Sequence, residues 1–151
     1  MPNGKVHATA TVLAAAVSTP VLLTLTSPPH ALSWAGGCLC GLLVTPDLDL
    51  EQPTRSHTLV RRSAGPVWML VWFLFWYPYA RLLPHRSPWS HAPVIGTLLR
   101  VAYMAFLPML GVFLWQGSVR LPGWLRSTPL LWGLSGLIFV DALHAGMDRL
   151  F

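Results

Sequence analysis

Histidine and aspartate side chains stand at the borders of the apolar segments of this chain, where together they can bind a metal ion. His7 opens the first apolar segment, and the string PDLD (46–49) ends the second. The string PHRSPWSHAP (84–93) comes directly before a later apolar segment, and DALHAGMD (141–148) ends the last one. Imidazole and carboxylate groups without cysteine suit zinc, with manganese and iron as alternatives. These four places therefore hold the candidate metal ligands.

The last of these strings has helical spacing. Asp141, His144 and Asp148 follow one another at i, i+3 and i+7, which places all three on one face of a helix. A histidine and an aspartate four residues apart can offer ligands to one ion from successive turns. Acids inside or at the edge of a membrane are costly to bury and usually face the interior of a helix bundle. We therefore expect this face to point toward the other candidate ligands.

The composition is that of an integral membrane protein. Of the 151 residues, 54% are hydrophobic and only 10% are charged, and the mean hydropathy is +0.54. Soluble domains carry about 25% charged residues, so this chain can hardly build a water-exposed surface. Residues 1–151 are predicted to form a single membrane domain with room for four or five spans. The net charge of +5 is scattered between apolar runs, which favours a lipid bilayer as partner and argues against nucleic acid.

Five apolar segments follow one another along the chain: 7–26, 31–45, 66–84, 93–115 and 128–148. The second is short and contains Gly36, Gly37 and Gly41. Such small residues let helices approach closely in lipid, so we expect this segment at the bundle centre. The third is crowded with tryptophan and tyrosine and is interrupted by Pro78. These aromatic residues prefer the membrane interface, and a helix of this kind can lie in the interface plane.

The distribution of basic residues separates two topologies. With four spans and an interfacial helix at 66–84, seven basic residues outside the spans lie on one side of the membrane and two, Arg120 and Arg126, on the other. With five spans the division is six against three. Because lysine and arginine gather on the cytoplasmic side, the first topology fits better. We therefore expect an all-α integral membrane protein of the cell (inner) membrane with four transmembrane helices, an aromatic interfacial helix and both termini cytoplasmic. Five spans are the alternative.

In the four-span topology all the candidate ligands fall at the cytoplasmic end of the bundle. The predicted metal ligands are His7, Asp47, Asp49, His85, His91, Asp141, His144 and Asp148. His30 belongs to the opposite end and His57 to a polar link, so neither is expected to bind the ion. Each ligand taken alone has a simpler explanation, such as a turn or a surface position. Their coincidence at one end of the bundle is what predicts a site.

These strings also resemble a known family. PDLD, the run HRSPWSH leading into APVIGTLLR, an N-terminal histidine and a final HAGMD together resemble a bacterial family of uncharacterised metal-binding integral membrane proteins. That family is similar to the membrane-bound metal-dependent hydrolases and, more remotely, to the helical zinc-dependent phospholipase C and nuclease group. The resemblance covers nearly the whole chain. The ligands that it implies are His7, Asp47, His85, His91, His144 and Asp148.

A metal-dependent hydrolase is the first functional hypothesis. A bound ion lowers the pKa of a water molecule toward neutrality and makes it a usable nucleophile. Asp49, together with Asp47, is expected to bridge or orient ions in this reaction. Arg86 is suited to hold a phosphate or carboxylate oxygen bidentately. The position at the membrane edge favours a lipid or a lipid-linked phosphoester as substrate.

Two other functions stay open at this point. A non-catalytic metal-binding scaffold or sensor would close the coordination shell with protein ligands, so the sequence does not decide whether the chain is an enzyme. A transporter would need polar residues through the middle of the membrane. Only Arg100 is a fixed charge well inside an apolar segment, and its long side chain can extend to the interface. Transport is therefore the least supported of the three functions.

Overall fold

The computed structural model describes residues 4–120, 123 and 127–150, and every regular element in these residues is a helix. The elements are α1 (Gly4–Leu25), α2 (Pro28–Cys40), the 3-10 turn η1 (Pro46–Asp49), α3 (Arg55–Ala64), α4 (Pro66–Leu82), α5 (Pro88–His91), α6 (Pro93–Gln116) and α7 (Thr128–Leu150). The prediction of an all-α chain is confirmed for this part of the molecule. Arg126 and both termini, which the orientation argument used, lie outside the described residues.

Three of the described helices, α1, α6 and α7, are long and apolar enough to cross a membrane. This finding is compatible with a membrane protein, but the expected count of four spans is too high, and so is five. The second apolar segment forms a helix of only 13 residues, because α2 is capped at Gly41. A helix of that length rises about 20 Å, which is short of the roughly 30 Å hydrocarbon core. The aromatic helix α4 has 17 residues and is not among the three.

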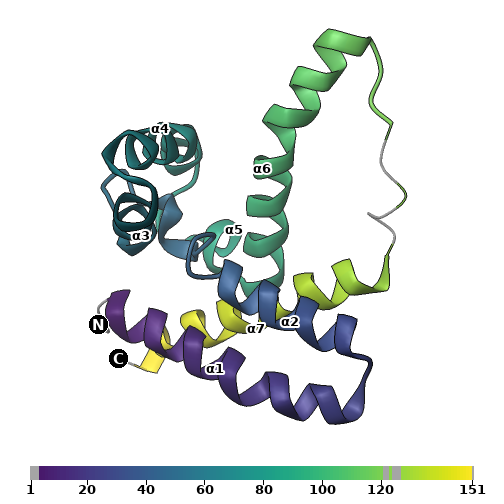
Figure 1. Ribbon diagram of the computed structural model, residues 1–151. Coiled ribbons are helices and arrows are strands. Elements are labelled where there is room, and N and C mark those ends of the chain that lie inside the picture. Colours follow the sequence, from purple (N-terminus) through teal and green to yellow (C-terminus); the bar gives the residue numbers. More distant parts are fainter. Residues whose placement is uncertain (1–3, 121–122, 124–126, 151) are drawn as a thin grey trace.

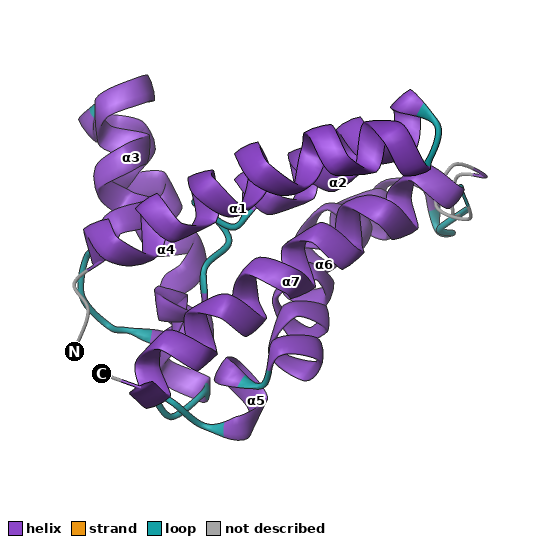
Figure 2. Ribbon diagram, turned by 90° about the horizontal axis from the view of Figure 1, so that it is seen from below, coloured by secondary structure: helices purple, strands orange, loops and turns teal. Residues whose placement is uncertain are grey.

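Helices α1, α2 and α7 lie side by side, with α2 packed along α7 (Figures 1 and 2). Small residues set this contact, as the sequence predicts. A methyl group on Gly37 would overlap the carbonyl oxygen of Gly133, and one on Gly136 would overlap the carbonyl oxygen of Trp34. Because glycine lacks that methyl group, the two backbones can approach closely.

The aromatic helix α4 packs against the first half of α6. It runs without a break through Pro78, so the predicted interruption there is wrong. Trp76 is 1% exposed and forms a small core with neighbours from η1 and α6. The Tyr103 hydroxyl of α6 donates to the carbonyl of Phe75 at 2.6 Å. These contacts place η1 between α4 and the three-helix bundle.

Beyond its first half, α6 runs steeply away from α7 (Figure 1). Its last turns expose large apolar side chains, and Trp115 is 88% exposed. At the other end of α6 several helix ends meet. Four chain segments gather in the left half of Figure 1: the start of α1, the turn that follows α2, the short helix α5 and the end of α7. The candidate ligands are carried by these helix ends.

Candidate metal centre

The turn η1 supplies two carboxylates that point in different directions. The Thr45 hydroxyl accepts a hydrogen bond from the backbone N–H of Asp47 at 3.4 Å, and Pro46 opens the turn. Leu48 is fully buried and anchors the turn in the aromatic core. A 3-10 helix has about three residues per turn, so residues two apart diverge. Asp47 therefore faces α7, while Asp49 faces the segment around α5.

The segment before α6 is shaped by its own hydrogen bonds. The Ser87 hydroxyl caps α5 by accepting from the backbone N–H of Ser90. Arg86 has a positive φ of 63°, a left-handed conformation that non-glycine residues rarely adopt. Its backbone N–H donates to Asp49 Oδ2 at 3.2 Å. The strained residue thus joins this segment to η1.

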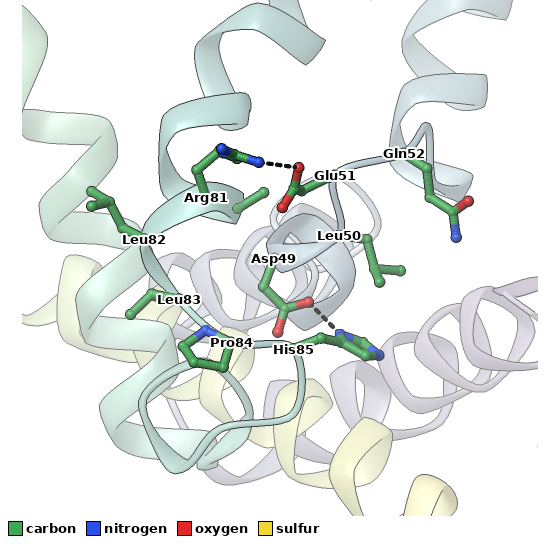
Figure 3. A pocket seen from close by; sticks show the side chains of 10 residues that line it. Asp49, Leu50, Glu51, Gln52, Arg81, Leu82, Leu83, Pro84 and His85 are labelled. Carbon is green, nitrogen blue, oxygen red and sulfur yellow. Dashed lines mark hydrogen bonds and ion pairs between the residues drawn. The ribbon is translucent and has the colours of Figure 1, made fainter.

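Asp49 accepts from two histidines of the same segment. His85 Nδ1 lies 2.7 Å from Asp49 Oδ1, and Figure 3 shows the carboxylate turned toward that ring. His91 Nδ1 lies 3.2 Å from Asp49 Oδ2. Asp49 itself is buried, whereas the His85 side chain is 36% exposed. In both histidines it is therefore the Nδ1 side that faces the carboxylate.

The other candidate donors meet around the end of α7. His144 Nε2 lies 3.4 Å from Asp47 Oδ1 and 3.4 Å from Asp148 Oδ2. His91 Nε2 lies 4.0 Å from the same Asp148 oxygen, and His7 Nε2 lies 3.2 Å from Asp148 Oδ1. The rings of His7 and His144 are stacked with their centres 3.8 Å apart. Three imidazoles and two carboxylates thus converge.

The Nε2 atoms of His91 and His144 are buried and face these carboxylate oxygens, but neither makes a hydrogen bond of proper geometry with a described residue. A buried polar atom without a partner costs about 1–3 kcal/mol, so such atoms call for an explanation. Two ligands of one tetrahedral zinc ion lie about 3.3 Å apart, given bonds of about 2.0–2.1 Å. The separations of 3.4 Å around His144 match that value. The donor set therefore fits a metal ion.

The carboxylates of η1 are held in their ionised form. Burial by itself raises the pKa of Asp47, but the surrounding imidazoles, that of His144 first, outweigh it and hold the pKa below its ordinary value. Burial also raises the pKa of Asp49, and its hydrogen bonds with His91 and His85 bring that pKa below the ordinary value as well. Ionised carboxylates are the form that metal binding requires.

Asp141 lies outside this group, although the sequence analysis counted it as a ligand. It forms an ion pair with Arg100 of α6 and also accepts from the Thr97 hydroxyl. Arg100 in turn donates from Nη1 to the carbonyl of Ser90 at 2.8 Å. Arg100 is fully buried, so it does not extend to the membrane interface as expected. This pair ties α7 to the turn that carries His91.

Three clefts border the cluster; one of them, of about 20 Å³ and lined by His7, Asp47 and His144, is too small for a substrate. Of the other two, the larger, of about 500 Å³, is lined by Asp49 and His85 and has Glu51 and Arg81 at its rim (Figure 3). The smaller, of about 360 Å³, lies between the α5 segment and the end of α7. Its lining includes Arg86, Ser87, His91, Asp148 and Arg149. The predicted substrate residue Arg86 thus lines the cleft that reaches two of the converging donors.

A family model described as Uncharacterized metal-binding protein (DUF2227) matches residues 2–140. The chain belongs to this family of metal-binding proteins. The match confirms the resemblance to an uncharacterised metal-binding family. It covers the α1 histidine, both η1 aspartates and both histidines near α5, while His144 and Asp148 lie beyond its end. No curated protein and no solved structure matches the chain.

For this metal-binding chain the structure brings together seven of the eight residues predicted as ligands: His7, Asp47, Asp49, His85, His91, His144 and Asp148. It leaves His30 at the far end, where the ring bonds with the Ser27 hydroxyl at 2.9 Å. His57 is buried in the cap of α3, where its Nδ1 accepts from the backbone N–H of Thr54. Both lie away from the cluster, as expected.

The sequence analysis missed the partners of Arg100. Asp141 is 41 residues away along the chain, and Thr97 and the carbonyl of Ser90 carry no signal of their own. One clue was present, since Arg100 and Asp141 are opposite charges inside two different apolar helices. Buried charges are usually paired, and each was the natural partner of the other.

Changing Asp141 to Asn separates a structural role from a ligand role. Asp141→Asn leaves the buried Arg100 without its counter-charge, so the free energy of unfolding should fall by about 3–5 kcal/mol. Unfolding in detergent micelles measures this change. The metal content of the folded fraction should stay at the wild-type level. Glu51→Gln, which breaks the exposed pair with Arg81, is the matched control and should leave the free energy of unfolding nearly unchanged, because exposed ion pairs contribute little. A variant of wild-type stability that lost its metal would instead make Asp141 a ligand.

Proposed function

We propose that this protein is a metal-dependent hydrolase of the cell membrane, with its ion held by His7, Asp47, His91, His144 and Asp148. The observation that carries the proposal is the pair of buried Nε2 atoms, on His91 and His144, that have no hydrogen-bond partner in the described part of the chain. Both atoms lie within 4.0 Å of a carboxylate oxygen of Asp148. An ion bound in the group formed by Asp47, His91 and His144 gives both of these atoms a partner.

Zinc is the proposed metal, because three of the five donors are imidazoles and zinc favours nitrogen ligands. Manganese and iron are the alternatives, since both accept imidazole together with carboxylate oxygen. Family membership supports a bound metal ion without naming it.

Asp49 positions the histidines in this proposal. The 2.7 Å separation from His85 Nδ1 is a hydrogen-bond length and is shorter than the roughly 3.3 Å between two ligands of one ion. A carboxylate on Nδ1 fixes the tautomer and leaves Nε2 as the ligand atom. For His91 that arrangement directs Nε2 toward Asp148. The sequence analysis made Asp49 a ligand and a catalytic group, and the geometry favours the role of orienting partner.

The proposed reaction is hydrolysis of a lipid or lipid-linked phosphoester. When bound, the ion supplies a lowered pKa for water and polarises a phosphoryl oxygen. Asp47 and Asp148 hold that ion from two different elements, and Asp49 keeps His91 in the required orientation. The cluster lies where apolar helices end, which supports a substrate reached from the bilayer.

The distribution of basic residues supports a site on the cytoplasmic side of the membrane. Although α2 is too short to count as a span, it runs back beside α1. His7 of α1, Asp47 after α2 and His144 of α7 therefore meet at one end of the bundle, where both chain ends lie in Figure 2. The basic residues Arg55, Arg61 and Arg62 of α3 follow η1 on the chain near that end. The positive-inside rule then favours both termini on the cytoplasmic side.

Metal content tests the ligand set. Wild-type protein purified in detergent without chelators should contain about one equivalent of divalent metal by elemental analysis. His144→Ala and Asp47→Ala each remove a donor to the ion and should lose most of it. His30→Ala, at the far end of the bundle, is the matched control and should keep the wild-type content. Metal-free wild-type protein would end the proposal.

Asp49→Asn tests the orienting role. An amide at this position can still accept from one imidazole but no longer fixes both tautomers, so metal affinity should fall about 10–100-fold. Competition with a chelator of known affinity measures that change. At saturating metal the stoichiometry should equal that of the wild type. Loss of the ion even at saturating metal would show that Asp49 is itself a ligand.

Phosphoester turnover separates the hydrolase from a scaffold or sensor. The scaffold or sensor is favoured by one feature: His144 belongs to two donor groups, His7–His144–Asp148 and Asp47–His91–His144, so protein ligands alone can fill a tetrahedral shell. Metal-loaded wild-type protein should release phosphate from phosphatidic acid in mixed micelles, and the activity should vanish with chelation and return with metal. A fully loaded protein that hydrolyses neither this lipid nor a soluble aryl phosphate would favour the scaffold.

A further inference from the structure

The two larger clefts beside the cluster differ in charge. In the larger cleft the Arg81 guanidinium pairs with the Glu51 carboxylate at 3.1 Å, so the two charges at its rim cancel (Figure 3). In the smaller cleft two arginines, Arg86 and Arg149, line the wall together with a single carboxylate, Asp148. Of the two clefts, the smaller is the one that has arginine side chains beside residues of the proposed metal centre.

Of these two clefts, the smaller is also the one that reaches the proposed ligands. His91 and Asp148 both line it. The larger cleft reaches Asp49 and His85 but none of the five proposed ligands. A molecule in the smaller cleft therefore lies beside the ion, whereas Asp49 and His85 separate a molecule in the larger cleft from it.

The lining residues show which ligand this cleft would take. It places the guanidinium group of Arg149 directly beside the proposed ligands Asp148 and His91, with Arg86 on the same wall. Such a site concentrates anions, and the planar guanidinium fork matches the paired oxygens of a phosphate group.

We propose that the smaller cleft binds the phosphate group of the substrate, with Arg149 as a binding residue beside Arg86. This inference rests on the proposed metal centre and names the substrate class of the same site. Arg149 ends α7 one residue after the ligand Asp148, so the helix that supplies the ion's ligand also supplies the cation that holds the anion.

The surroundings of the cleft fit a phosphate carried by a lipid. Trp89, next to the lining residue Pro88, is 61% exposed, and Leu150, next to Arg149, is 79% exposed. Tryptophan gathers at the level of lipid headgroups, and an exposed leucine at the same mouth extends the apolar surface. Free phosphate shares the chemistry of the headgroup, and the experiment below separates the two sources.

Titration with inorganic phosphate tests the cleft in metal-loaded protein. Cobalt in place of the native metal gives an absorption band that reports an anion beside the ion. Arg149→Gln should weaken phosphate binding about tenfold or more, because hydrogen bonds to charged groups are the strong ones. Arg149→Lys keeps the positive charge but lacks the planar guanidinium group, so its phosphate affinity should lie between those of the wild type and Arg149→Gln. Arg86→Asn removes the second cation with a residue type that tolerates the left-handed backbone, and it should weaken binding similarly.

Arg81→Gln is the matched control, because it removes the arginine of the other cleft and should leave phosphate affinity unchanged. Cobalt content and unfolding are measured for every variant, so lost binding is not mistaken for lost metal or lost fold. If Arg149→Gln binds phosphate as tightly as the wild type, or if Arg81→Gln alone weakens it, the inference is overturned while the metal centre stands. Protein that takes up no metal at all overturns the proposed function instead.

Nanodiscs identify the source of the phosphate. In phosphatidylcholine nanodiscs containing phosphatidic acid, the cobalt band of the wild type should shift without added phosphate, and Arg149→Gln should reduce that shift. Nanodiscs of phosphatidylcholine alone should give no shift. A response to inorganic phosphate but not to phosphatidic acid would overturn the lipid as source and leave a soluble phosphate compound as the ligand.

Discussion

The site depends on where α2 ends. Glycines allow the backbones of α2 and α7 to approach closely, and α2 ends at Cys40 after 13 residues. Its neighbours α1 and α7 have 22 and 23 residues. The turn η1 can therefore reach between the start of α1 and the last turns of α7 instead of lying beyond them. This early end brings the carboxylate of Asp47 to 3.4 Å from the imidazole of His144. A fully spanning second helix would have carried that carboxylate past the other donors.

The remaining polar groups are arranged in layers around this contact. Asp47 faces the central donors, and Asp49, two residues later in a tight turn, faces the histidines around α5. Behind them the Arg100–Asp141 pair ties the α5 turn to α7 through the carbonyl of Ser90. A buried ion pair of this kind is weak evidence for stability. Here it fixes the spacing between two elements that both contribute to the cluster.

Much of the helical structure could be predicted from local pattern. The segments expected at 93–115 and 128–148 differ from α6 and α7 by at most two residues at each end. The second segment was expected to run to Thr45, but its helix ends at Cys40, because the chain turns there to begin η1. The predicted break at Pro78 does not occur: α4 continues to Leu82, and Trp76 and Tyr79 on either side of Pro78 are buried in one core with η1 and α6. Helix ends and breaks depend on such contacts, which a hydropathy pattern does not contain.

By itself the sequence determined which chemical groups stand at the helix ends, because residue type and the 3.6-residue period are local properties. Of the eight side chains that it predicted as ligands, the structure gathers seven at one end of the bundle and pairs the eighth, Asp141, with Arg100. Only the tertiary structure decided how these groups are paired. It joined Asp141 to Arg100 across 41 residues, and it directed both oxygens of Asp49 to imidazoles. The physical reason is that pairing depends on which faces of distant helices meet, and that is settled by packing.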